Sequence, residues 1–125
     1  MATSFSTAIS RTDATLGKVS QHTTSFATAG DYVQTERLLI TEAGEITIAI
    51  NSAITGGNGP GWLIVKNHDA TNFLKVGTVT TVYWAEADPG DGTETMMVPI
   101  ARGATNIYAR ADTADVDATF EIYER

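Results

Sequence analysis

Short runs of alternating apolar and polar residues, separated by turn-forming clusters, fill most of the chain after residue 31. The last run is the clearest, because apolar residues recur at every second position: Val116, Ala118, Phe120 and Ile122. A period of two places alternate side chains on one face of a strand. The pattern therefore predicts a half-buried β-strand over 116–124.

A β-hairpin is predicted over 61–77, where two apolar-rich runs are joined by a turn at 68–71. Asn67, Asp69 and Asn72 flank or occupy this turn, and we expect their side chains to hydrogen-bond to the turn backbone. Further strands are predicted by alternation or by enrichment in β-branched residues: 31–41, 45–50, 78–84, 96–100 and 106–111.

These segments repeat at intervals of about 8 to 12 residues, as in a sandwich or barrel. We therefore predict an all-β fold over 31–125, an antiparallel β-sandwich or jelly-roll-like arrangement of about eight strands. Pro99 has no N–H for a ladder, which predicts an edge position or a strand end. The glycine-rich segment 51–61 is predicted to be a loop, and no amphipathic helix is evident.

Residues 1–30 differ from the rest, because they are rich in Thr, Ser and Ala and contain only widely spaced apolar residues. Thr and Ser favour extended backbone but bury little apolar area. Two interpretations remain open for this segment. It forms a pair of edge strands of the sandwich, or it is an extended N-terminal arm that becomes ordered against a neighbouring subunit.

The composition narrows the function classes. A chain of 125 residues is long enough for one domain. Its formal charge of −7 argues against binding nucleic acid or an anionic membrane surface. It has no cysteine for disulfides or thiolate metal sites, no secretory signal, and no apolar run near the roughly 20 residues of a membrane span. We expect a soluble protein made in a cytoplasm.

The acidic loop 86–94 is the best place to look for a metal site. Asp88, Asp91 and Glu94 offer several oxygens, which is the ligand type that calcium requires. The run Asp-Pro-Gly-Asp-Gly is also ordinary turn chemistry, and we favour that plainer interpretation. No metal or other cofactor is therefore assigned.

Catalytic motifs are not apparent. No serine lies in a Gly-x-Ser-x-Gly elbow, and the glycines of 56–59 lack the spacing of a phosphate-binding loop. Nothing marks two of the acids as a catalytic pair. We expect a protein that is not an enzyme.

Aromatic residues at outward-facing positions are candidates for a protein interface. Tyr108 and Tyr123 are out of phase with the apolar residues of their strands, and Tyr83 and Trp84 end another predicted strand. Such residues combine a large apolar body with a polar tip, which suits interfaces. The alternative is that a second sheet or the N-terminal segment covers them. Together with Trp62, the pair Tyr83 and Trp84 also suits a carbohydrate-binding module.

Three segments carry a resemblance to a known class of proteins. The hairpin sequence GWLIVKNHDATNFLKVG (61–77), the strand MVPI (97–100) and the segment IYARADTADV (107–116) together resemble small structural proteins of tailed-bacteriophage virions. The resemblance covers about the C-terminal half of the chain.

The resemblance implies a β-sandwich subunit of the virion, assembled in the host cytoplasm, that forms a homo-oligomer and has no enzymatic role. It implies as partners the major capsid protein or other virion proteins, and self-association as a dimer or trimer. We expect a capsid decoration or cement protein that stabilises the head lattice. The alternatives are a tail or head-to-tail connector component and, from a different class, the carbohydrate-binding module.

Overall fold

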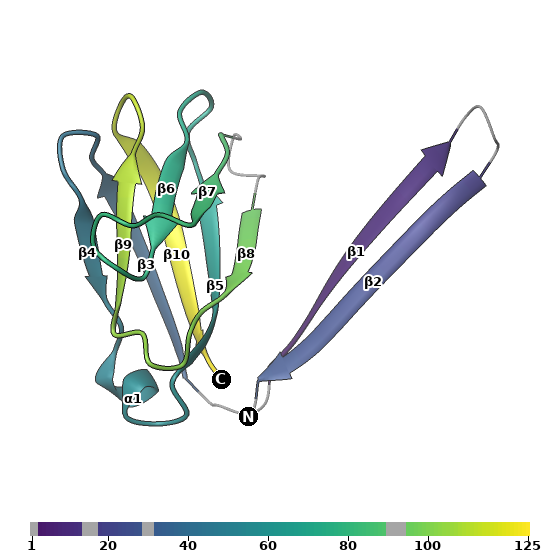
Figure 1. Cartoon of the computed structure of the whole chain (residues 1–125), viewed down its shortest axis with the longest axis horizontal. Coiled ribbons are helices and arrows are strands. Elements are labelled where there is room, and N and C mark those ends of the chain that lie inside the picture. Colours follow the sequence, from purple (N-terminus) through teal and green to yellow (C-terminus); the bar gives the residue numbers. More distant parts are fainter. Residues whose placement is uncertain (1–2, 14–17, 29–31, 90–94) are drawn as a thin grey trace.

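The computed structural model describes residues 3–13, 18–28, 32–89 and 95–125, and for the first two ranges it describes the backbone alone. Eight strands between residues 32 and 125 form two four-stranded antiparallel sheets that pack face to face (Figure 1). This confirms the prediction of an all-β antiparallel sandwich of about eight strands.

The strand order in what we call the first sheet is β3 (Val33–Ile40), β10 (Val116–Glu124), β5 (Pro60–Asn67), β8 (Thr95–Pro99). The order in the second sheet is β4 (Ile46–Ala49), β9 (Asn106–Ala111), β6 (Leu74–Gly77), β7 (Ala85–Ala87). Pro99 ends β8 at the edge of the first sheet, as predicted.

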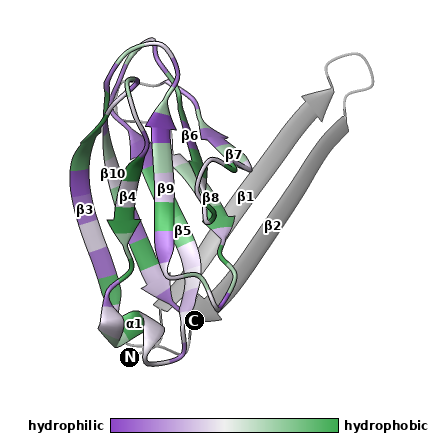
Figure 2. Cartoon of the chain, turned by 60° about the vertical axis from the view of Figure 1, so that its left-hand side comes forward, coloured by the Kyte–Doolittle hydropathy of each residue, from purple (hydrophilic) through white to green (hydrophobic). Residues whose placement is uncertain are grey.

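The core lies between the two sheets and is built from the alternate apolar positions of the strands. Phe120 of β10 is its largest fully buried side chain. Burying such a side chain contributes about 1.5–3 kcal/mol relative to leaving it exposed. The buried residues around it come from both sheets and include Ile40, Leu63, Val65, Ile48, Leu74, Val76, Ile107 and Ile122. Figure 2 shows hydrophobic and hydrophilic positions alternating along β9, whereas β3 is hydrophobic at both ends and hydrophilic between them.

The predicted hairpin over 61–77 is wrong. β5 pairs with β10 and β8, whereas β6 pairs with β9 and β7, so the two strands belong to opposite sheets. The chain between them is an arch that crosses the core. An arch and a hairpin have the same alternating pattern, because in both cases the apolar side of each strand faces the core.

Asn67, at the end of β5, shows why the chain crosses here. Its side chain is fully buried, and its amide donates to the carbonyl of Asn72 at 2.9 Å and to that of Ala87 in β7 at 3.1 Å. Its oxygen accepts the N–H of Asp69 at 2.8 Å, and Asp69 in turn accepts the N–H groups of Thr71 and Asn72. The expected hydrogen bonds to the turn backbone are confirmed for Asn67 and Asp69, and Asn67 also links the two sheets.

The predicted strand over 78–84 is also wrong. Residues 78–84 form a loop with one isolated bridge, between Val79 and Val82, and the strand β7 begins only at Ala85. β7 therefore occupies part of the segment expected to be the acidic loop 86–94. The Thr- and Val-rich composition suggested a strand, but the backbone turns at Thr81, whose φ is 60°.

The segment 51–61 is a loop only in part. It contains the short helix α1 (Ser52–Thr55), and β5 begins at Pro60. The side chain of Asn51 caps the helix by accepting the N–H of Ala53 at 2.8 Å. Across the ranges that the structure describes, no helix is long and apolar enough to cross a membrane.

The N-terminal segment forms a hairpin of its own, β1 (Thr3–Asp13) and β2 (Lys18–Thr28). The antiparallel register runs from Thr3 opposite Thr28 to Asp13 opposite Lys18. In the described backbone this hairpin pairs with neither sheet of the sandwich, and Figure 1 shows it as a separate ribbon.

Candidate functional site

The loop 78–84 crosses the outer face of the second sheet. It leaves β6 and returns to β7, yet it bonds to Glu45, which precedes β4 at the opposite edge of that sheet. The path therefore passes over β9 (Figure 1). Gly77 permits the close approach, because a Cβ at this position would collide with the carbonyl oxygen of Val82.

Glu45 anchors the loop through three hydrogen bonds. Its carboxylate accepts from the Thr80 hydroxyl at 2.6 Å, the Thr81 N–H at 2.8 Å and the Tyr83 hydroxyl at 2.5 Å. The hydrogen bonds from Thr80, Tyr83 and Thr81 hold the pKa of Glu45 below its ordinary value. Burial, followed by the bond to Glu45, raises the pKa of Tyr83.

Thr81 adopts a backbone conformation that is unusual for its residue type. It has a φ of 60°, and among the described residues it is the only residue other than glycine with positive φ. A β-branched residue is strained in this region, and such strain persists only where surrounding contacts impose it. The bond from the Thr81 N–H to Glu45 is such a contact. The loop is thus held in a defined shape over the sheet.

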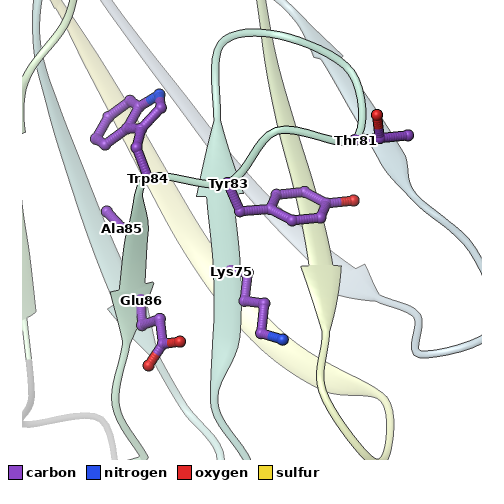
Figure 3. Close-up of a pocket in the computed structure, with 6 residues that line it drawn as sticks. All are labelled: Lys75, Thr81, Tyr83, Trp84, Ala85 and Glu86. Carbon is purple, nitrogen blue, oxygen red and sulfur yellow. The ribbon is translucent and has the colours of Figure 1, made fainter.

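A cavity of about 540 Å³ lies between this loop and the edge of the second sheet. Its lining comes from β6, the loop and β7: Lys75, Thr81, Tyr83, Trp84, Ala85 and Glu86. Figure 3 shows the Tyr83 ring extending toward the Thr81 end of the loop and the Trp84 indole turned the other way. Trp84 is 43% exposed, which is high for a tryptophan.

Two opposite charges lie together on one side of the aromatic residues (Figure 3). Lys75 of β6 lies opposite Glu86 of β7 in the strand register. The Lys75 ammonium is also 3.4 Å from a carboxylate oxygen of Asp112 and lies over the ring of Phe73. The site therefore offers an aromatic surface next to a cation and an anion, a combination that suits recognition of protein side chains or of a sugar ring.

The structure divides the four interface candidates between the two outer faces of the sandwich. Tyr83 and Trp84 both line the cavity. Tyr108 lies on β9, opposite Gly77 in the register, and is half-buried. Tyr123 lies on β10 in the other sheet, opposite Val33 on one side and Trp62 on the other.

Tyr123 is also half-buried, and its hydroxyl donates to Glu121 at 2.7 Å. Burial, with this bond to Glu121 as the second cause, raises the pKa of Tyr123 to about 12. Trp62, the third aromatic residue of the carbohydrate-binding alternative, lies beside Tyr123 and not beside Trp84. The three residues of that alternative are therefore not brought together.

The candidate calcium ligands are placed only in part. Asp88 is exposed just after β7, whereas Asp91 and Glu94 lie outside the described residues. Among residues 32–89 and 95–125, no group of three or more His, Asp or Glu side chains is arranged to hold a metal ion.

Sequence reasoning missed Glu45, Lys75 and Thr81 as parts of the site. Glu45 follows Gly44 at the start of a predicted strand, where a solvated acid is unremarkable. Its role depends on a loop that lies 35 or more residues later in the chain. The one local signal was Gly77, because a glycine at the end of a strand marks a close approach of another backbone segment.

Comparisons of the chain with protein-family models, with curated proteins and with solved structures give no match. The site is therefore interpreted from its own geometry and chemistry.

Proposed function

We propose that this protein is a structural component of a tailed-phage virion, and specifically a decoration or cement protein that binds the outer surface of the capsid lattice. The observation that carries the proposal is the presence of aromatic contact residues on both outer faces of one rigid sandwich. Trp84 lies on the second sheet, and Tyr123 and Trp62 lie on the first. A subunit that bridges two neighbours needs two such surfaces.

The proposed mechanism is mechanical reinforcement of the capsid lattice. Each copy contacts the major capsid protein and other copies of itself through several small interfaces. Avidity over a symmetric lattice then makes attachment much stronger than any one contact. The resemblance of 61–77, 97–100 and 107–116 to small virion proteins supports this role. The strongly acidic composition agrees with binding to protein and not to the packaged nucleic acid.

Binding to assembled shells tests the proposal. Purified protein is mixed with phage heads that lack it, the heads are sedimented, and the bound copies are counted. We expect saturable binding and greater resistance of the heads to heat and osmotic shock. Trp84→Ala should weaken binding. The matched control is Leu39→Ala, which removes a similarly exposed side chain six positions along β3 from the Val33–Tyr123 pair and so away from both aromatic contact surfaces. Heads that gain no resistance on saturation contradict the cementing role.

Copy number separates this role from a tail or head-to-tail component. A shell cement is present in hundreds of copies, whereas a ring around the tail axis has about six to twelve. Counting copies per particle by quantitative mass spectrometry distinguishes the two.

A carbohydrate-binding role is the second candidate, favoured by the exposed Trp84 at a cavity that also presents Lys75 and Glu86. Aromatic rings stack on the apolar faces of sugars, while charged groups bond to their hydroxyls. Glycan-array binding that disappears in Trp84→Ala, with no binding to heads, favours this alternative over the structural role.

A further inference from the structure

The β1–β2 hairpin lacks a third strand in the described backbone. Its two strands of 11 residues pair only with each other. An isolated two-stranded hairpin is marginally stable in water, and a third strand or a packing surface is needed for stability. The hairpin therefore requires a surface that the paired strands themselves do not supply.

The first sheet presents a row of apolar residues at one end of its outer face. The strand register aligns four residues side by side across all four strands, and we call them the Trp62 row: Val33, Tyr123, Trp62 and Pro99. The next row on the same face consists of Ile64 and Met97 together with the polar residues Thr35 and Glu121. Val33 is 49% exposed, and the adjacent Tyr32 is 54% exposed. The apolar surface thus reaches the edge of the sheet where the N-terminal segment joins it.

We propose that the β1–β2 hairpin of one copy docks on the Trp62 row of a second copy. The inference rests on the self-association included in the proposed function, but it does not depend on the capsid. A reciprocal exchange of this kind makes two identical contacts around a two-fold axis.

The residues that share one side of the hairpin suit such a contact. The register pairs Phe5 with Phe26 and Ile9 with His22. Alternate positions of a strand share one face, so Phe5, Ile9 and Phe26 belong to the same side of the hairpin. At the end away from the turn that side holds Phe5, Ile9 and Phe26, and toward the turn it also holds His22, Arg11, Asp13 and Lys18. The other phase holds Val19 and otherwise small and polar residues.

The distribution of charge favours the contact. Residues 1–30 contain two basic residues and one acid, whereas residues 31–125 contain six basic and fourteen acidic residues. Two whole sandwiches repel each other at neutral pH, but the weakly basic hairpin approaches an acidic sandwich without that penalty.

A second copy is a better acceptor than the hairpin's own sandwich because the connection is short. Tyr32 is already held, since its N–H donates to the Glu124 carboxylate and its carbonyl accepts the Glu124 N–H. Only residues 29–31 then separate β2 from a fixed point. The shortest connection between the two sheets, 112–115, uses one residue more. Stacked sheets lie about 10 Å apart, so a reversal onto the same outer face is difficult with three residues.

Sedimentation velocity of the full chain tests the proposal. We expect the wild type to dimerise reversibly. Val33→Asp should weaken the dimer by about tenfold or more, because it places a charge in an apolar contact. Val79→Asp is the matched control. Val79 is 57% exposed and lies on the side of the second sheet, so this substitution should leave dimerisation unchanged. Phe26 lies outside the sandwich, and Phe26→Asp should weaken the dimer as Val33→Asp does.

Cross-linking distinguishes a second copy from the same chain. The sequence has no cysteine, so a thiol-specific cross-linker reacts only at a cysteine that is introduced. Copies that carry Thr24→Cys are mixed with differently tagged copies that carry Thr35→Cys, on the outer side of β3, and treated with a short bismaleimide. We expect a cross-linked pair, and no pair when Thr47→Cys on β4 replaces Thr35→Cys.

Three results overturn the inference. They are a wild type that stays monomeric at high concentration, equal effects of Val33→Asp and Val79→Asp, and an intrachain cross-link in a chain that carries both Thr24→Cys and Thr35→Cys. A dimer that forms as described but does not bind heads contradicts the proposed capsid role and leaves the hairpin exchange intact.

Discussion

Asn67→Ala should destabilise the protein more than any other single truncation of a polar side chain that we consider. Asn67 is fully buried, and its amide group makes three hydrogen bonds, to Asn72, Ala87 and Asp69. The bond to Ala87 reaches the other sheet. The substitution therefore removes the polar link on which the arch between β5 and β6 depends.

The magnitude follows from the three bonds. Each is worth about 1 kcal/mol net, which gives a loss of about 3 kcal/mol in the free energy of unfolding. The partners left without a bond in the interior make this a lower bound. For a domain of this size, a loss of about 3 kcal/mol corresponds to a fall in Tm of about 12 °C.

Urea unfolding followed by circular dichroism measures the effect. We expect a lower midpoint with an unchanged slope, since the same surface is exposed on unfolding. Asn106→Ala is the matched control, because the Asn106 side chain donates an exposed hydrogen bond to the neighbouring Thr105 hydroxyl, whose loss should cost less than about 0.5 kcal/mol. A loss for Asn67→Ala no greater than that of Asn106→Ala refutes the reasoning.

Three further predictions concern the loop and the outer faces. Gly77→Ala should lower the free energy of unfolding by about 2 kcal/mol or more, because the new Cβ collides with the Val82 carbonyl. Gly44 has open space around it, so in the same urea assay Gly44→Ala should change the free energy of unfolding by less than about 0.5 kcal/mol. Glu45 has a lowered pKa, so the stability that its carboxylate contributes is present above the ordinary pKa of 4.5 and is lost as the pH falls through the pKa of the folded state. In thermal melts below pH 4.5, the Tm of Glu45→Gln should therefore fall less than the Tm of the wild type. Tyr123 has a raised pKa, so the stability that its neutral hydroxyl contributes is present below the ordinary pKa of 10.0 and is lost as the pH rises toward about 12. In thermal melts over that pH interval, the Tm of Tyr123→Phe should fall less than the Tm of the wild type, and equal falls contradict the raised pKa.

The strands were predictable where one face is buried and the other is solvated. β10 alternates between Val116 and Ile122 without interruption, and its ends are correctly predicted from that period alone. The connection between β5 and β6 was not predictable in this way. A hairpin and an arch bury the same alternate residues, and the bond that decides between them joins Asn67 to Ala87, 20 positions further along the chain.

The site was predictable only as a set of residue types. Tyr83 and Trp84 were predicted as candidate contact residues from their chemistry, and the structure places both at one cavity. The loop that holds them was assigned to a strand, because Thr and Val favour extended backbone. The turn at Thr81 is imposed by Glu45, a contact distant in sequence that overrides local propensity.

An electron-cryomicroscopy map of phage particles produced by a genome that encodes this chain tests the central claim most directly, because it shows location, copy number and contacts together. The account predicts a two-layer β-sandwich on the outer surface of the head, in hundreds of copies, with the Trp84 face against the capsid protein and each N-terminal hairpin on a neighbouring copy. Particles whose heads carry no density for this sandwich contradict the account.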